Sequence, residues 1–410
     1  MNRYAQICGL RKIYFYFLLL LNLSIFIVWY EEANYGSLIN WYGNFYRHIV
    51  YRQIYANRSD LLDGHRLNIS VVVVVNNGDQ LQKEYTLAHR TVRCYCALHA
   101  YPLTVIDLDH WRYRDECPQQ DFMFRRHCAL AKWLSMSPSI QYALFVDADM
   151  GVINPNHLLE HFLANFEANL PRGSFDLIFY ERIFNGEIMA GSYWAKNSRF
   201  TIEMLRYWAN FSVPSRNPFR GGTDNGAIHA VFLDIVCGPQ CSELGARCLD
   251  LWADARHFGE LRPFELCVRA ILGARQQFRI DPNTSGLKLH LDGDNGAGRV
   301  LLVTDFRQYW SRDGWLTGNQ WSPRDFLLHG WQLRRMDQPT FARWHSPLTL
   351  STPSLNDNFD LNCANAKKAS LHWPFKESFM LSESEIDAKI GAIVKRRRRD
   401  DLKVLAPILA

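Results

Sequence analysis

The stretch ISVVVVV (residues 69–75) decides the fold, and the turn residues Asn76, Asn77 and Gly78 follow it directly. A continuous β-branched run without polar alternation predicts a strand that is buried on both faces, as in parallel sheets covered by helices. The Asn-Asn-Gly that follows is typical of a turn. The stretch therefore predicts the first strand of an α/β domain.

Strands and helices alternate after this stretch. Further strands are expected over residues 103–108, 142–146, 175–180, 188–195 and 301–304. Helices are expected over residues 79–97, 122–134, 198–211, 225–235 and from Glu383 to the basic run near the C-terminus. This alternation predicts a mixed, mostly parallel sheet flanked by helices. The domain is expected over residues 69–335, with a C-terminal extension over 336–410.

An apolar segment precedes the domain. Residues 13–30 (IYFYFLLLLNLSIFIVWY) carry no charge and would span about 27 Å as a helix, enough for a bilayer core. Basic residues on its N-terminal side predict a signal anchor, with residues 1–12 cytoplasmic and the rest translocated. A cleaved signal peptide is the alternative, but no small-residue cleavage pattern precedes Glu31. Residues 31–68 are expected to form an aromatic-rich stem.

Nine of the ten cysteines follow the apolar segment, so an oxidising compartment should pair most of them and leave one over. Cys237, Cys241 and Cys248 have a spacing that also allows a zinc knuckle, although disulfides are favoured in that compartment. Four sequons agree with glycosylation, at Asn57, Asn68, Asn210 and Asn283.

The net charge of +5 comes from 46 Lys and Arg against 41 Asp and Glu. The run Lys395–Arg399 alone supplies five positive charges, so the remainder of the chain is neutral. No nucleic-acid partner is expected, because phosphate binding needs a basic face. The run is interpreted as a solvated or processed tail in preference to a contact with anionic lipid.

Two acids follow the strand at residues 142–146. Asp147 and Asp149 are separated by one residue, and Asn154-Pro155 comes soon after. Ligands of open α/β sheets gather at the carboxyl ends of strands, where two carboxylates can share a hard divalent cation. Such a cation can also neutralise a departing diphosphate. A solvated pair of strand-end acids is the alternative.

The segment Leu144–Pro155 resembles the DxD signature of GT-A glycosyltransferases, the nucleotide-diphospho-sugar transferase superfamily. It is similar to Golgi galactosyl- and xylosyltransferases and, more closely, to a nematode-expanded family of uncharacterised GT-A proteins. The matching segments are residues 145–149, 190–195, 224–229 and 327–331. The resemblance covers about residues 69–335 and implies a GT-A (Rossmann-like) fold.

The resemblance also implies metal ligands. Asp147 and Asp149 would hold Mn²⁺ (or Mg²⁺) against the donor diphosphate, and His329 would complete the coordination. Two carboxylates and an imidazole are a reasonable ligand set for Mn²⁺. A histidine packed among tryptophans is the other interpretation of His329.

Further residues are implied in binding and catalysis. Asp224 and Asn225 match an acid-amide pair beside the transferred sugar and are the catalytic candidates, although Asp224 could instead be an N-cap. The related transferases usually carry glutamine where this chain has Asn225, which is shorter.

The nucleotide would be held by two other groups. Asn76 and Asn77 lie where the superfamily binds base and ribose, with a plain turn as the alternative. Arg125 and Lys132 share a helix face that could point at the diphosphate, with a solvated face as the alternative.

The sequence thus predicts a metal-dependent glycosyltransferase that moves a hexose or pentose from a nucleotide-diphosphate sugar, expected to be UDP-linked, to a glycan hydroxyl. It would be a type II Golgi membrane protein with a luminal catalytic domain, and a homodimer is a further expectation. A catalytically inactive, membrane-tethered carbohydrate-binding protein is the main alternative. A metal-dependent phosphodiesterase would need a denser His/Asp cluster near the first strand.

Overall fold

The computed structural model describes residues 66–167, 171–211, 223–237, 243–274, 286–290, 297–349, 363 and 373–409. The predicted cytoplasmic segment 1–12, the anchor 13–30 and nearly all of the stem lie outside these residues. Within the described ranges, no helix combines the length and apolarity needed to cross a membrane.

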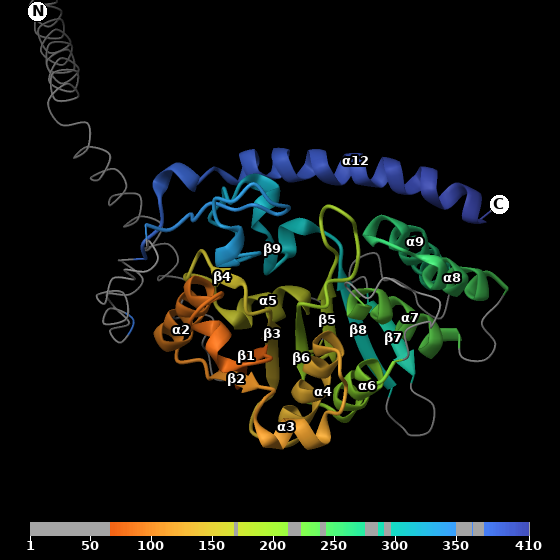
Figure 1. Ribbon diagram of the computed structural model, residues 1–410, viewed down its shortest axis with the longest axis horizontal. Helices are drawn as coiled ribbons and strands as arrows, with labels where there is room; N and C mark the ends of the chain where they lie inside the picture. The colour runs from red at the N-terminus through yellow and green to blue at the C-terminus, as the bar shows by residue number, and fades with distance from the viewer. Residues whose placement is uncertain are drawn as a thin grey trace, which may run out of the picture. The chain divides into compact units, whose positions relative to one another are not determined.

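The main sheet has seven strands in the order β2-β1-β3-β6-β5-β8-β7 (Figure 1). Strand β1 pairs in parallel with β2 and β3, and β5 pairs in parallel with β8, whereas β6 and β7 run antiparallel to their neighbours. The bounds are β1 Ile69–Val75, β2 Leu103–Asp107, β3 Tyr142–Val146, β5 Leu177–Tyr180, β6 Ser192–Lys196, β7 Gly286–His290 and β8 Ala297–Val303. The predicted mixed, mostly parallel sheet is confirmed.

Both faces of the sheet are covered, which explains why β1 lacks polar alternation. Val71, Val73 and Val75 belong to one core with α2 (Thr86–His99) and α5 (Leu159–Phe166). Val72 and Val74 belong to a second core on the other face. The helices of that second core are α4 Phe122–Ser135, α6 Arg199–Ala209, α7 Thr223–Cys237, α8 Glu243–Asp254 and α9 Phe258–Ala274.

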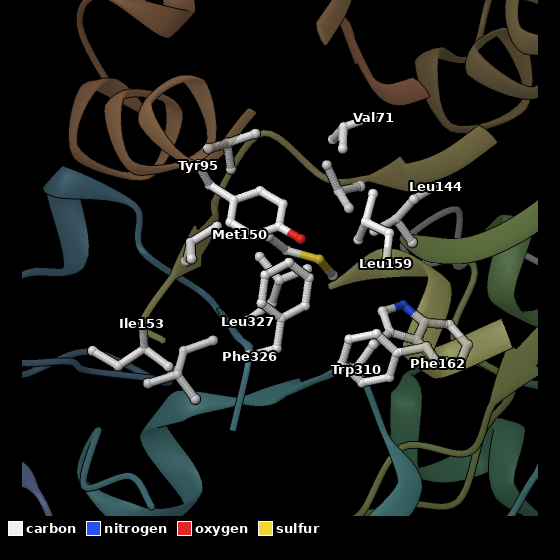
Figure 2. Packing of buried hydrophobic residues seen from close by; sticks show 14 of the residues in the cluster. Val71, Tyr95, Leu144, Met150, Ile153, Leu159, Phe162, Trp310, Phe326 and Leu327 are labelled. Atoms are coloured by element: carbon white, nitrogen blue, oxygen red, sulfur yellow. The ribbon is translucent and has the colours of Figure 1, made fainter. Parts of the chain in front are cut away.

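A second, smaller sheet begins after the three residues that follow β3. It contains β4 (Met150–Val152), β10 (Leu327–His329) and β9 (Ser311–Asp313), with β10 in the middle. Strand β10 is antiparallel to β4 and parallel to β9. Figure 2 shows Met150, Phe326 and Leu327 gathered around Tyr95 of α2, and the rings of Tyr95 and Phe326 lie 4.9 Å apart. This packing fixes the small sheet against the first core.

The segment after residue 335 contributes to the same core. Trp344, Leu348, Trp373, Ile386 and Ile390 are buried in the cluster that includes one face of β1. The helix predicted from Glu383 is confirmed and extends through the basic run as α12 (Glu383–Leu409), which passes near β9 and α9 (Figure 1).

The interpretation of the basic run as a solvated tail is corrected by this helix. Arg397 points inward, with only 9% of its side chain exposed, and it pairs with Glu181. The other four members of the run, Lys395, Arg396, Arg398 and Arg399, are exposed. A helix in contact with the domain along one face buries one residue of such a run and leaves its neighbours in water.

Three disulfides lie among the described cysteines: Cys94–Cys363, Cys117–Cys128 and Cys248–Cys267. Cys96 is a buried free thiol. Since Cys248 is bonded to Cys267, it cannot serve the zinc knuckle considered above. Cys241 and the side chain of Cys237 fall outside the described part of the chain.

The Cys94–Cys363 bond joins residues 269 positions apart and ties the C-terminal segment to α2. We expect non-reducing peptide mapping to recover Cys94 linked to Cys363 and Cys96 as a free thiol. Replacing both bonded cysteines with serine should lower the free energy of unfolding by about 2–5 kcal/mol in denaturant titrations. A peptide linking Cys96 to Cys363 would contradict the pairing.

Candidate metal centre

The two acids of the DxD segment lie in the tight connection between β3 and β4. The Asp147 amide donates to the Gly191 carbonyl at 2.8 Å, and the Met150 amide donates back to the Asp147 carbonyl at 3.0 Å. A Cβ on Gly191 would lie 2.1 Å from Asp147 Oδ2, so glycine is required for this approach. The backbone therefore fixes where the Asp147 carboxylate lies.

The segment after β10 clamps Asp149. The amides of Gly330 and Trp331 donate to the Asp149 carbonyl at 3.2 and 2.9 Å, and the Gln332 side chain donates to Asp149 Oδ2 at 2.8 Å. The Trp331 indole lies directly on Gly151, where a Cβ would come within 2.0 Å of the ring. Because β10 pairs with β4, His329 stands opposite Met150, next to both acids.

The predicted ligand set is therefore brought together. His329 Nε2 lies 3.3 Å from Asp149 Oδ1 and 3.8 Å from Asp147 Oδ2. One ligand atom from each of the three residues lies within 4.8 Å of the others, so the group could hold a metal ion. Their side chains are 22% (Asp147), 8% (Asp149) and 15% (His329) exposed, which leaves an open side for a ligand. Carboxylate oxygens with one imidazole suit Mn²⁺ or Mg²⁺ better than a soft metal.

The second ring nitrogen of His329 is fixed by Asp313. Nδ1 donates to Asp313 Oδ1 at 2.9 Å, which turns Nε2 toward the acids, as carboxylate–histidine pairs do in metal sites. Burial lowers the pKa of His329, but the carboxylates of Asp149 and Asp313 outweigh it and raise the pKa to about 10. The imidazole must therefore lose a proton from Nε2 before it can bind a metal ion.

Asp313 is held in turn by Arg182. The guanidinium donates to both Asp313 oxygens, at 3.1 and 2.5 Å, and to Glu187 at 2.7 Å. Burial favours the neutral carboxyl, but Arg182 and His329 together hold the pKa of Asp313 well below its usual range. Neither Arg182 nor Asp313 was a candidate from the sequence, where no motif marks them.

Arg126 is the arginine that contacts Asp147 of the DxD segment. It is buried and pairs with Asp147 through Nη1 and with Asp224 through Nη2. Burial raises the pKa of Asp147 to about 6, against the opposing effect of Arg126. The guanidinium thus bridges the end of β3 to the start of α7.

Arg125 and Lys132 do share a helix face, but the structure turns that face toward residues 108–117. The guanidinium of Arg125 donates to the carbonyls of Cys117 and Leu108, each at 3.0 Å. Lys132 pairs with Glu116 of α3 (Trp111–Glu116). The expectation that this face points at the diphosphate is corrected, because Arg126, about 100° further around α4, occupies the position beside the acids.

Asp224 and Asn225 lie beside this cluster with their side chains engaged inward. Asp224 is the second residue of α7, 2% exposed, and its Oδ2 accepts from Arg126 and from His127 at 3.3 Å. Asn225 accepts from the Ala190 amide at 2.9 Å and donates to Glu187 at 3.2 Å.

The second partner of Asp224, His127, is a neutral imidazole. Burial lowers the pKa of His127 to about 4, so the ring donates to Asp224 from Nε2 and accepts from the Tyr193 hydroxyl at 2.9 Å. The ring also stacks on Trp208 at 3.6 Å.

Asn76 and Asn77 follow β1 at the same edge of the sheet, but the hydrogen bonds of Asn77 go to residues other than the candidate metal ligands. Asn77 caps a 3₁₀ turn, η1 (Gly78–Leu81), by accepting from the Asp79 amide at 2.8 Å, and it donates to Asp109 at 3.1 Å. Asn76 is exposed. The turn interpretation accounts for Asn77, while Asn76 stays open to a ligand.

Replacing Asp224 with asparagine should destabilise the fold. The change leaves Arg126 buried without one of its two carboxylates, which costs about 3 kcal/mol or more. Burial opposes ionisation of Asp224, but Arg126 and His127 outweigh it and lower its pKa from 3.8 to about 2. The stabilisation is therefore complete above pH 4 and lost as the pH falls through 2.

Denaturant titrations at pH 7 and pH 3 test this expectation. The difference between wild type and Asp224→Asn should be smaller at pH 3, and the exposed Asp115→Asn control should change little at either pH. Equal differences at both values would contradict the assignment.

Comparisons with known proteins place the chain in a family. Among solved structures, it is similar to a glycosyltransferase involved in the glycosylation of the major capsid of PBCV-1, with 15% identity and a TM-score of 0.32 over 42% of this chain and 78% of that one. It is also similar to A197 from STIV, with 12% identity and a TM-score of 0.22 over 36% and 71%. No curated protein matches. Residues 92–343, more than half of the chain, match the family described as "Protein of unknown function, DUF273". The chain therefore belongs to the DUF273 family.

Proposed function

We propose that the chain is a metal-dependent glycosyltransferase that moves a hexose or pentose from a nucleotide-diphosphate sugar, expected to be UDP-linked, to a glycan hydroxyl. The observation that carries the proposal is the group of Asp147, Asp149 and His329 at the carboxyl end of β3. This is the edge at which open α/β sheets bind their ligands.

Asp147, Asp149 and His329 would hold Mn²⁺ or Mg²⁺, which supplies positive charge for the departing diphosphate when bound. Each ligand is already oriented by a second contact: Asp147 by Arg126, Asp149 by Gln332 and His329 by Asp313. Ligands fixed in advance cost little reorganisation when charge develops, which is how preorganised sites lower barriers.

Asp224 and Asn225 contact residues that position the candidate metal ligands. Because Arg126 bridges Asp224 and Asp147, the Asp224 carboxylate fixes the position of Arg126 and, through it, of Asp147. Asn225 connects the Ala190 backbone to Glu187, which contacts Arg182. We propose that both act as positioning residues, with electrostatic stabilisation of the leaving group as the main source of rate.

An aromatic group beside His329 supports a carbohydrate ligand. The ring of Trp315 lies 5.3 Å from the rings of both Phe184 and Phe341, and Phe341 is 73% exposed. A Cβ on Gly330, next to His329, would be 3.8 Å from Trp315. Sugar rings pack their C–H faces on such side chains, so this group is the proposed acceptor side. It equally fits the second candidate, an inactive carbohydrate-binding protein.

The location is a proposal from the sequence. Residues 13–30 would anchor the chain in the Golgi membrane as a type II protein with the catalytic domain in the lumen. The three disulfides agree with an oxidising compartment, since such bonds rarely persist in the cytosol.

The proposal is tested by measuring Mn²⁺-dependent binding and hydrolysis of a panel of nucleotide-sugars by the full chain, purified in detergent from a secretory host. We expect at least one UDP-sugar to bind and hydrolyse slowly only with Mn²⁺. Asp149→Ala should lower turnover at least a hundredfold, because it removes a metal ligand, whereas Asp115→Ala, an exposed acid, should not.

Two outcomes would go against this assignment. Unchanged donor binding and turnover in Asp149→Ala would refute the metal-dependent transferase. Binding of glycans, reduced by Trp315→Ala, with no nucleotide-sugar binding at all would favour the carbohydrate-binding protein.

A further inference from the structure

Arg397 is set apart from its basic neighbours by the phase of α12. It follows Ile390 by seven residues and Ile386 by eleven, which places the three side chains on one face of the helix. Ile386 and Ile390 are buried in the core, and Arg397 continues their stripe toward the main sheet. The inward arginine therefore enters the protein at a fixed place.

Arg397 contacts the turn between β5 and β6. Its guanidinium pairs with Glu181 and donates to the carbonyls of Arg182 and Ile183 at 2.8 and 3.3 Å. Nε lies 3.6 Å from Asp401, one turn further along α12. Three backbone or side-chain acceptors on consecutive residues are thus held by one side chain.

Helix α9 holds the same turn from a second direction. Arg269 pairs with the other oxygen of Glu181 at 2.6 Å and donates to the Gly186 carbonyl at 2.8 Å. Gly186 has a φ of +71°, and a Cβ there would lie 2.8–3.0 Å from the guanidinium atoms of Arg262 and Arg397. The turn is therefore closed tightly under arginines from two helices.

The inner side of the turn leads to the metal centre. Arg182, whose carbonyl Arg397 binds, directs its own guanidinium to Asp313, and Asp313 accepts from Nδ1 of His329. The path from Arg397 to His329 thus runs through one backbone carbonyl, one arginine side chain and one carboxylate.

We propose that Arg397 is a positioning residue for the metal centre: it holds the backbone of Arg182 so that Arg182 and Asp313 keep His329 Nε2 turned toward Asp147 and Asp149. The proposal rests on the proposed metal site and adds a support for it from α12, beyond the family match at residues 92–343. Substituting a residue that hydrogen-bonds to a metal ligand typically lowers metal affinity about 10–100-fold. Arg397 contacts His329 only through Arg182 and Asp313, so we expect an effect at the lower end of that range.

The experiment measures Mn²⁺ affinity by calorimetry on the full chain, with the metal alone and no donor. Arg397→Ala should weaken Mn²⁺ binding about tenfold. Arg397→Lys, which keeps the charge but loses the forked geometry, should be intermediate and serves where the alanine variant does not fold. Arg396→Ala and Arg398→Ala are the matched controls, because they remove the same charge from exposed positions of the same run, and they should bind Mn²⁺ like wild type.

A double-mutant cycle separates positioning from general destabilisation. If Arg397 acts through Asp313, the effects of Arg397→Lys and Asp313→Asn on Mn²⁺ affinity should be clearly less than additive in the double variant. Additive effects, or wild-type affinity in folded Arg397→Lys and Arg397→Ala while Asp149→Ala abolishes binding, would overturn this inference and leave the proposed function intact. Absence of Mn²⁺ binding in the wild-type chain would instead refute the metal site, and both proposals with it.

Discussion

The pairing of β4 with β10 is the constraint on which the centre depends. It brings residue 329 opposite residue 150 although 179 positions separate them, and it places the His329 imidazole beside both acids. The register is fixed beyond the strands themselves, since the Trp331 indole fills the space over Gly151 and two amides close on the Asp149 carbonyl. A shift of one residue would turn His329 to the opposite face of the small sheet.

Around that pairing, the protein buries several paired charged side chains. Taking charges out of water is costly, and a buried ion pair rarely contributes more than a well-packed apolar pair would. The pairs of Arg126 with Asp147 and Asp224, and of Arg182 with Asp313 and Glu187, are therefore poorly explained as sources of stability. Their directionality explains them better. Each forked guanidinium ties two acids from different parts of the chain to fixed positions, as a site that must hold ligand atoms in place requires.

The sequence predicted those elements whose signal is local. Strands β1 and β3 match their predicted bounds. Both faces of the sheet are covered, so every position of these strands is buried and the sequence shows an unbroken apolar run. The small sheet was missed, since strands of three residues carry no period to detect.

The same distinction holds in the site. The three candidate metal ligands could be predicted because the acids follow a recognisable strand and the histidine belongs to a segment with a family resemblance. Arg126 was passed over for Arg125, since both lie on one helix and only the tertiary packing decides which of them faces the acids. Asp313 and Arg182 could not be found at all, because their partners lie 16 and 131 residues away.

In the basic run, too, only the tertiary packing decides which residue of a helix faces the protein interior. Five consecutive positive residues predict a solvated segment, and four of them are indeed exposed in α12. A helix that rotates about 100° per residue must nevertheless turn one of every three or four toward whatever it packs against. For Arg397 that neighbour is a turn already carrying Glu181, so an arginine is tolerated where an apolar residue would leave Arg269 as the remaining partner of the carboxylate. The C-terminal helix is thus fixed to the domain by the same kind of buried, forked contact that organises the candidate metal centre, and the two sets of contacts meet at Arg182, one through its carbonyl and the other through its side chain.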